Sequence, residues 1–229
     1  MGGSAQVAYQ FRFGALLRFT DEIVEGVLLT LQFSVVTMIC GLFIGLLVAI
    51  ASTGKVRALR VAARIYVETI RNTPLLVQLF IVFFGLPSIG IRLGANTAAL
   101  IALSINMGAY GAEILRAGFE SVRQSQVEAG RSLGLTAGQT LRPVVLFQAV
   151  KAIYPALTSQ FVLIMLATSV VSSIGATELF NTAAYIDSRT YLSFEAYALI
   201  TLSYLVLTLG FRGLFATIYW LAFVRRPRR

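Results

Sequence analysis

Four long stretches without a single charged side chain determine what this chain can fold into. Each contains 20 to 29 residues, and they are Gly26–Gly54, Asn72–Ile91, Leu93–Ala112 and Ala152–Thr177. About 20 helical residues cross the hydrocarbon core of a bilayer, so each stretch is predicted to be a transmembrane helix. The 229-residue chain is 57% hydrophobic and only 13% charged, which excludes a soluble domain because so much apolar surface could not be buried.

A fifth span is predicted over Ala196–Val224, although Arg212 interrupts it. An arginine is tolerated at such a place only near the membrane interface or against a protein partner. The second span is expected to begin before its uncharged stretch, near Arg64. The predicted fold is therefore an all-α integral membrane protein with five transmembrane helices.

The distribution of Lys and Arg predicts the orientation of these spans. With the N-terminus outside, thirteen of these cations lie in inner segments, four lie in outer segments, and two lie within spans. Lys and Arg accumulate on the inner side of membranes, so an outer N-terminus and an inner C-terminus are predicted. Residues 1–23 then form an outer or interfacial segment, 24–224 the transmembrane domain with an inner loop at about 117–150, and 225–229 a basic inner tail.

The inner loop contains a polar stretch, SQVEAGRSLGLTAGQ, with signals for two short helices. Ser125 precedes Glu128 by three residues, and Thr136 precedes Gln139 by three. Both pairs fit the capping box, in which two side chains bind backbone N–H groups at the start of a helix. Gly134 is expected to end the first helix in the left-handed conformation. From the residues alone, this helix either only orders a long loop or docks on an inner partner and transmits force.

Residues that carry catalysis or bind metals are scarce. Histidine is absent, the single cysteine is Cys40, and no G-x-x-x-x-G-K-[ST] loop is present to hold nucleotide phosphates. The ten Asp and Glu residues are scattered, mostly near span ends. The chain is therefore predicted to be a transport subunit rather than an enzyme, with no metal site and no cofactor of its own.

Polar side chains within the predicted spans are candidates for a transport pathway. Gln78 and Asn106 are favoured because amides are costly to place in lipid, whereas a single hydroxyl group more often makes a hydrogen bond between helices. The candidate set is Gln78, Asn106, Tyr110, Thr168, Ser169 and Ser172. Two pairs with a spacing of three residues are predicted to form structural ion pairs, namely Glu68 with Arg71 and Glu113 with Arg116.

The stretch VEAGRSLGLTAGQTLRPVVLFQA, which begins at Val127, resembles the EAA loop of ATP-binding-cassette importer permeases. Four further blocks are similar to the polar amino acid branch of that family: EGVLLTL from Glu25, YVETIRNTPLLVQLF from Tyr66, GAYGAEILRAG from Gly108 and SVVSSIGATEL from Ser169. The resemblance extends from about residue 24 to residue 222, and the blocks occur in the family's order.

This resemblance implies that the helical loop is a coupling helix that rests on a separate ATPase subunit. The coupling residues would be Glu128, Ala129, Gly130, Ser132, Leu133, Gly134 and Leu135. The resemblance also implies two ATPase subunits that bind ATP and magnesium, and a second permease subunit that is identical or paralogous. An external solute-binding protein would deliver the amino acid, and the assembly would lie in a bacterial inner membrane.

Three positions depart from the family pattern, one of them Phe147, which replaces a proline of the motif while Pro143 stands four residues earlier. Gly130 replaces an alanine of the EAA motif, and Ala167 replaces an aspartate that members often carry. Without that carboxylate, this subunit is expected not to recognise a cationic side chain, so the solute would be neutral or acidic unless a partner subunit supplies the charge. The alternatives are a permease of another importer branch and a self-sufficient channel or secondary carrier, which would need no ATPase.

Overall fold

The computed structural model describes residues 10–122, 124–140 and 145–225, and within these ranges the chain is helical without a β-strand. Segments labelled η are short 3-10 or π-helical turns. The elements are η1 (Phe13–Phe19), α1 (Thr20–Thr53), α2 (Arg57–Arg71), α3 (Leu75–Phe80), η2 (Ile81–Gly85), η3 (Leu86–Ile89), α4 (Ala95–Glu120), α5 (Gln124–Ser132), α6 (Ala137–Thr140), α7 (Phe147–Ala167), η5 (Thr168–Ile174), α8 (Leu179–Thr190), α9 (Ser193–Tyr219) and η6 (Trp220–Val224).

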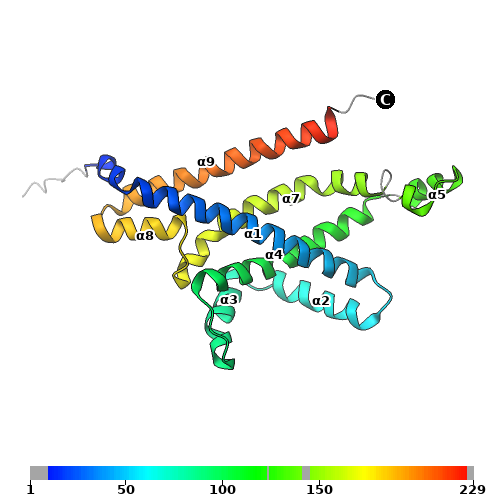
Figure 1. Ribbon diagram of the computed structural model, residues 1–229, viewed down its shortest axis with the longest axis horizontal. Coiled ribbons are helices and arrows are strands. Elements are labelled where there is room, and N and C mark those ends of the chain that lie inside the picture. Colours follow the sequence, from blue (N-terminus) through cyan, green and yellow to red (C-terminus); the bar gives the residue numbers. More distant parts are fainter. Residues whose placement is uncertain (1–9, 123, 141–144, 226–229) are drawn as a thin grey trace, which may run out of the picture.

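Four long helices, α1, α4, α7 and α9, run along the long axis of the molecule (Figure 1). Each is long and apolar enough to cross a membrane, and α2 together with α3–η3 brings the number of candidate spans to as many as five. The α1–α2 turn, α5 and the end of α9 lie at one end of the axis, which we call the α5 end. η1 and α8 lie at the opposite end, the α8 end.

The second predicted span is not one continuous helix. α2 begins at Arg57, earlier than the expected start near Arg64, and the chain bends by 109° between α2 and α3–η3. Pro74 stands at the bend; it has no N–H for a helical hydrogen bond and disfavours the helical conformation of the residue before it. As a result, α3–η3 projects sideways from the bundle (Figure 1).

The backbones of α1 and α4 approach each other closely. A Cβ atom added to Gly45 of α1 would lie 2.8 Å from the backbone nitrogen of Ala112 and 3.0 Å from the carbonyl oxygen of Gly108, both on α4. Small residues on facing helices permit such contacts in membrane proteins. No side chain therefore separates α1 from α4 at this point.

The middle of the molecule contains an apolar core that joins four elements. Phe33 of α1, Leu79 of α3, Leu103 of α4 and Val171 of η5 are buried together. This cluster fixes the base of the projecting α3–η3 segment against α4 and η5.

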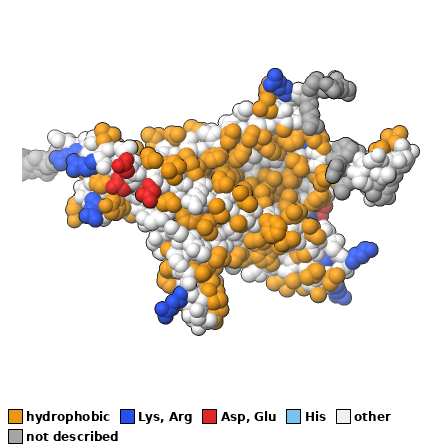
Figure 2. All heavy atoms as spheres, in the orientation of Figure 1, with side chains coloured by type: hydrophobic (Ala, Val, Ile, Leu, Met, Phe, Trp, Pro, Cys, Tyr) orange, Lys and Arg blue, Asp and Glu red, His pale blue; other side chains and the backbone are white. Residues whose placement is uncertain are grey.

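The surface between the two ends is largely apolar (Figure 2). Charged side chains are visible at both ends and near the tip of the projecting segment, whereas the middle is covered by hydrophobic ones. In the span formed by α9 and η6, only 11% of an apolar 18-residue window is buried within the chain. Apolar patches of this extent face lipid or another protein.

The sequence did not predict α8, which is anchored by a buried glutamate. The carboxylate of Glu178 accepts hydrogen bonds from the backbone N–H of Asn181 at 2.9 Å and from the hydroxyl of Tyr204 at 2.5 Å. The hydroxyl oxygen of Thr30 accepts a hydrogen bond from the N–H of Leu179 at 3.1 Å. These contacts attach the first turn of α8 to α1 and α9.

Glu178→Gln is expected to reduce the pH dependence of stability. Burial raises the pKa of Glu178, so the folded protein holds this proton more tightly than the unfolded chain does. Stability should then fall as the pH rises above 4.5, the usual glutamate value, through the higher folded pKa. Glutamine keeps a hydrogen-bond acceptor without the charge. The unfolding temperature of the Glu178→Gln variant, measured by circular dichroism in detergent, should therefore vary less with pH in that range.

Glu178→Ala is the matched comparison. It removes both acceptor oxygens and is expected to cost about 1–3 kcal/mol in the free energy of unfolding at neutral pH. If the Gln and Ala variants lost the same free energy of unfolding, the hydrogen bonds to residue 178 would not be what holds α8.

Candidate functional site

The segment from α5 to α6 is held by caps at both helix boundaries. After α5, Gly134 adopts φ +77°, and the N–H of Leu135 donates to the carbonyl of Gly130 at 3.1 Å. The N–H of Thr136 donates to Oε1 of Gln139 at 2.9 Å, and the N–H of Gln139 donates to Oγ1 of Thr136 at 3.3 Å. The predicted left-handed turn and the second capping box are confirmed.

The capping box predicted at Ser125 is wrong. α5 already includes Gln124, so Ser125 lies inside the helix rather than at its cap. The side chain of Glu128 instead accepts a hydrogen bond from Nε2 of Gln124 at 3.0 Å, and its backbone carbonyl accepts one from the hydroxyl of Ser132 at 3.0 Å. These polar residues therefore stabilise the body of α5.

α5 has a buried residue, Gly130, in contact with α6, and Leu133 follows its last residue with an exposed side chain. Gly130 is buried, and a Cβ at this position would lie 3.1 Å from Cγ2 of Thr140 on α6. Glycine in place of the expected alanine therefore relieves the contact between the two helices. Leu133 has 81% of its surface exposed. The result is a capped helix that presents an unburied leucine at the α5 end of the molecule.

Gln78 and Asn106 lie together as an amide pair between α3 and α4. Nδ2 of Asn106 donates to Oε1 of Gln78 at 3.0 Å, and both residues are buried. Nε2 of Gln78 also donates to the carbonyls of Ile70 at 2.7 Å and Thr73 at 3.1 Å, so this side chain closes the break between α2 and α3. Its amide has only two N–H donors, and both are used. Gln78 therefore positions the bend, and a solute could bind it only by breaking these contacts.

A row of ion pairs continues from this bend along α4. Arg71 lies 3.4 Å from Glu113, Arg116 lies 2.8 Å from Glu113, and Arg116 lies 2.6 Å from Glu120. The guanidinium of Arg71 also stacks over the ring of Tyr110 at 5.4 Å from its centroid. The pair predicted between Glu113 and Arg116 is present, and it belongs to a larger network.

The ion pair predicted between Glu68 and Arg71 is not formed. Arg71 binds Glu113 on the neighbouring helix, and a carboxylate oxygen of Glu68 accepts a hydrogen bond from the side chain of Asn72 at 3.1 Å. α2 packs against α4, so Arg71 reaches a carboxylate across the helix contact rather than along its own helix. A single sequence contains no signal for such a contact.

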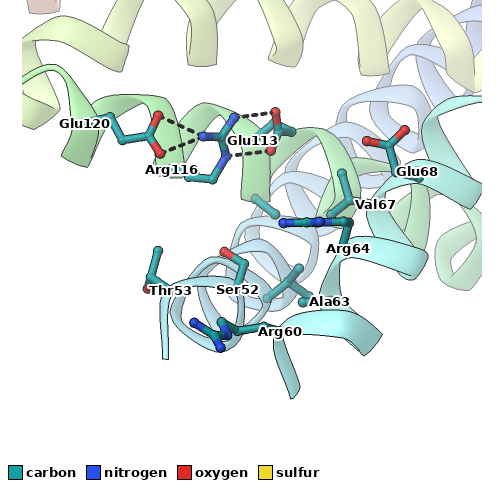
Figure 3. A pocket seen from close by; sticks show the side chains of 12 residues that line it. Ser52, Thr53, Arg60, Ala63, Arg64, Val67, Glu68, Glu113, Arg116 and Glu120 are labelled. Atoms are coloured by element: carbon teal, nitrogen blue, oxygen red, sulfur yellow. Dashed lines mark hydrogen bonds and ion pairs between the residues drawn. The ribbon is translucent and has the colours of Figure 1, made fainter. Parts of the chain in front are cut away.

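A cavity of about 390 Å³ lies beside this row, between the α5-end segments of α1, α2 and α4 (Figure 3). Arg60 and Arg64 of α2 and Ser52 of α1 line one side, and the ion pairs of α4 line the other. Arg60 and Arg64 form no ion pair with any residue that the structure describes. Charges in a membrane bundle face protein or water rather than lipid, so this half of the subunit contains a polar chamber.

The hydroxyl candidates do not join the amide pair. Thr168, Ser169 and Ser172 lie on η5, and each hydroxyl donates to the carbonyl three residues earlier at 2.7–2.8 Å. No hydrogen bond connects them to Gln78 or Asn106 within the described ranges. The predicted pathway residues are therefore separated into the amide pair, the three hydroxyl residues of η5, and Tyr110, which lies under Arg71.

Comparison with known proteins gives consistent results. A family model described as "Binding-protein-dependent transport system inner membrane component" matches residues 41–219. The Rickettsia conorii protein GlnP, provisionally named a glutamine transport system permease protein, is 37% identical over 201 residues, which cover 86% of this chain and 92% of GlnP. The L-cystine transport system permease protein TcyB of Bacillus subtilis is 41% identical over 164 residues, which cover 72% of this chain and 70% of TcyB.

A solved structure supports the same assignment. The crystal structure of an amino acid ABC transporter with histidines contains a chain that superposes with a TM-score of 0.86 and 37% sequence identity. The match covers 92% of this chain and 99% of that one. By its long apolar helices, its sequence relatives and this structural match, the chain belongs to the family of binding-protein-dependent transport system inner membrane components.

Proposed function

We propose that this chain is the permease subunit of an ATP-driven importer that carries polar amino acids across a bacterial inner membrane. Family membership and relatives named for glutamine and L-cystine transport support this function. Two partner ATPase subunits bind ATP and magnesium, a second permease completes the pathway, and an external binding protein delivers the solute.

The exposed Leu133 on its capped helix is the observation that carries this proposal. An exposed apolar side chain on a short helix is the kind of anchor that enters a groove of a partner protein. The caps keep α5 folded while the partner moves, as a lever between ATPase and spans requires. The positive-inside distribution of Lys and Arg supports an inner location for the α5 end, which places α5 where a soluble ATPase can reach it.

The charges of the subunit favour a neutral or acidic solute. Ala167 supplies no carboxylate near the middle of α7–η5, and Glu113 is already paired with Arg71 and Arg116. In the described part of the spans, few unpaired carboxylates are therefore available to bind a cationic side chain of a solute.

Reconstitution tests the proposal directly. The permease is co-expressed and co-purified with a candidate partner ATPase, reconstituted in liposomes and supplied with a candidate external binding protein. Radiolabelled L-glutamine, L-glutamate, L-cystine and L-arginine are then offered with ATP or with a non-hydrolysable analogue. Uptake of a neutral or acidic amino acid only with ATP is expected. Uptake that needs neither ATP nor the ATPase would instead favour a channel or secondary carrier.

A further inference from the structure

Arg212 is the one charged residue in the α9–η6 sequence between Glu195 and Arg225. It lies thirteen residues from Arg225, which corresponds to about 20 Å along a helix. Arg212 is therefore well inside the apolar span, where a cation requires a partner or water. Its role is unexplained by the coupling loop and by the row of ion pairs on α4.

No residue that the structure describes forms an ion pair with Arg212. The segment 147–174, which forms the neighbouring α7 and η5, contains no Asp or Glu. Among the described residues, the ion pairs are confined to Arg71, Glu113, Arg116 and Glu120. Arg212 is therefore available to an anion from outside the described part of this chain.

A groove between α7 and α9 leads to Arg212. Its volume is about 320 Å³, and Val162, Phe215 and Tyr154 supply apolar walls. The hydroxyl of Tyr154 donates to the carbonyl of Phe215 at 2.9 Å, which fixes the two helices on either side. The groove therefore contains one guanidinium group, between two helices that a hydrogen bond holds together.

Two hydroxyl groups complement this cation. Thr158 and Ser159 line the same groove. The hydroxyl of Thr158 donates to the carbonyl of Pro155 at 3.0 Å, which leaves its oxygen free to accept a hydrogen bond. Ser159 makes no side-chain hydrogen bond within the described part of the chain, so it can also accept one. The groove therefore offers donors at Arg212 and acceptors on α7.

We propose that Arg212 binds the α-carboxylate of the transported amino acid, while Thr158 and Ser159 accept hydrogen bonds from its ammonium group. This inference rests on the proposed function and names a solute-contacting residue for it. A zwitterion carries both groups on one carbon, and the groove is large enough for a small one. A lipid phosphate fits less well, because Trp220, of a residue type enriched at the membrane interface, is about 12 Å along the helix from Arg212.

The same contact predicts a preference against cationic solutes. Arg212 repels a lysine or arginine side chain, and Ala167 offers no carboxylate to offset this repulsion. Two features of the subunit then disfavour a cationic solute: the positive charge of Arg212 and the lack of a carboxylate at Ala167.

Equilibrium binding to the purified permease–ATPase complex tests this assignment without the external binding protein. The probes are each amino acid that the uptake panel shows to be transported, and the corresponding α-amide, which lacks the carboxylate. Arg212→Leu is expected to weaken binding of the amino acid by about 10- to 100-fold, as for loss of a buried charge-assisted contact. Binding of the α-amide should change little, and Arg212→Lys should recover part of the loss.

Arg225→Leu is the matched control, because it removes a cation from the same helical segment outside the groove, where Arg225 stacks on Trp220 at 5.5 Å. It should bind like the wild type. Unchanged preference for the amino acid over its α-amide in Arg212→Leu would overturn the inference. Loss of the second permease from the Arg212→Leu complex in native mass spectrometry would also overturn it, because the anion would then be a partner carboxylate. If the wild-type complex takes up no amino acid at all, the proposed function fails instead.

Discussion

Leu133→Asp is expected to abolish ATP-driven uptake while leaving the subunit folded in the membrane. Leu133 has 81% of its surface exposed on the capped α5, so a charged residue there meets water in the free subunit and costs little. In a groove of an ATPase, an unpaired carboxylate would lose about 2–4 kcal/mol of binding, which reduces the affinity roughly 30- to 1000-fold. Co-purification of the ATPase and uptake in liposomes measure this effect.

Leu17→Asp is the matched control, because Leu17 is 76% exposed and lies on η1 at the opposite end of the molecule. It should retain the ATPase. Gly134→Asp tests the cap separately, since φ +77° disfavours any residue with a Cβ by about 1–2 kcal/mol. Normal ATPase binding and uptake in both Leu133→Asp and Gly134→Asp would remove the coupling role from α5.

Gly45→Leu is expected to prevent accumulation of the folded subunit. A Cβ at residue 45 would lie 2.8–3.0 Å from backbone atoms of α4 at Gly108, Gly111 and Ala112. Backbone cannot move aside as a flexible side chain can, so the helices must separate. Overpacking of this kind costs about 3 kcal/mol or more, a large share of the stability of a domain. Membrane yield and the unfolding temperature in detergent report the loss.

Gly213→Leu on α9 is the matched control, since an added Cβ there meets no atom within 4 Å in the subunit. It should accumulate like the wild type. If Gly45→Leu and Gly213→Leu were equally stable, the close approach of α1 and α4 would be incorrect.

The long apolar helices could be predicted because their signal lies in the sequence itself. A run of 20 or more uncharged, largely apolar residues favours a helix in lipid without reference to any other part of the chain, although the run at 72–91 is broken near its start. The left-handed Gly134 and the box of Thr136 with Gln139 were predictable for the same reason, since each depends on residues within one turn. Ser125 shows the limit, because whether a hydroxyl caps a helix depends on where the helix starts.

The bend after α2 and the partner of Arg71 depend on contacts between distant segments. The break at Pro74 was not predicted, and its angle of 109° is held by Gln78, whose amide reaches back to α2 and across to Asn106. Arg71 pairs with Glu113, 42 positions away in the chain. α8 was missed because it is amphipathic and too short to cross a membrane, so it gave no hydropathy signal.

The contact between α1 and α4 also determines which parts of the subunit are free to move. Two helices whose backbones touch cannot slide or rotate against each other without a clash, so α1 and α4 should move as one rigid body. α9 is held to α7 differently, by the hydrogen bond from Tyr154 to Phe215 and by the flat ring of Phe161 against those of Phe211 and Phe215, with centroids 4.8–5.3 Å apart. Such rings can slide over one another at a smaller cost. We therefore expect α1–α4 to serve as the stationary axis of the transport cycle, with α9 as the helix that shifts around it.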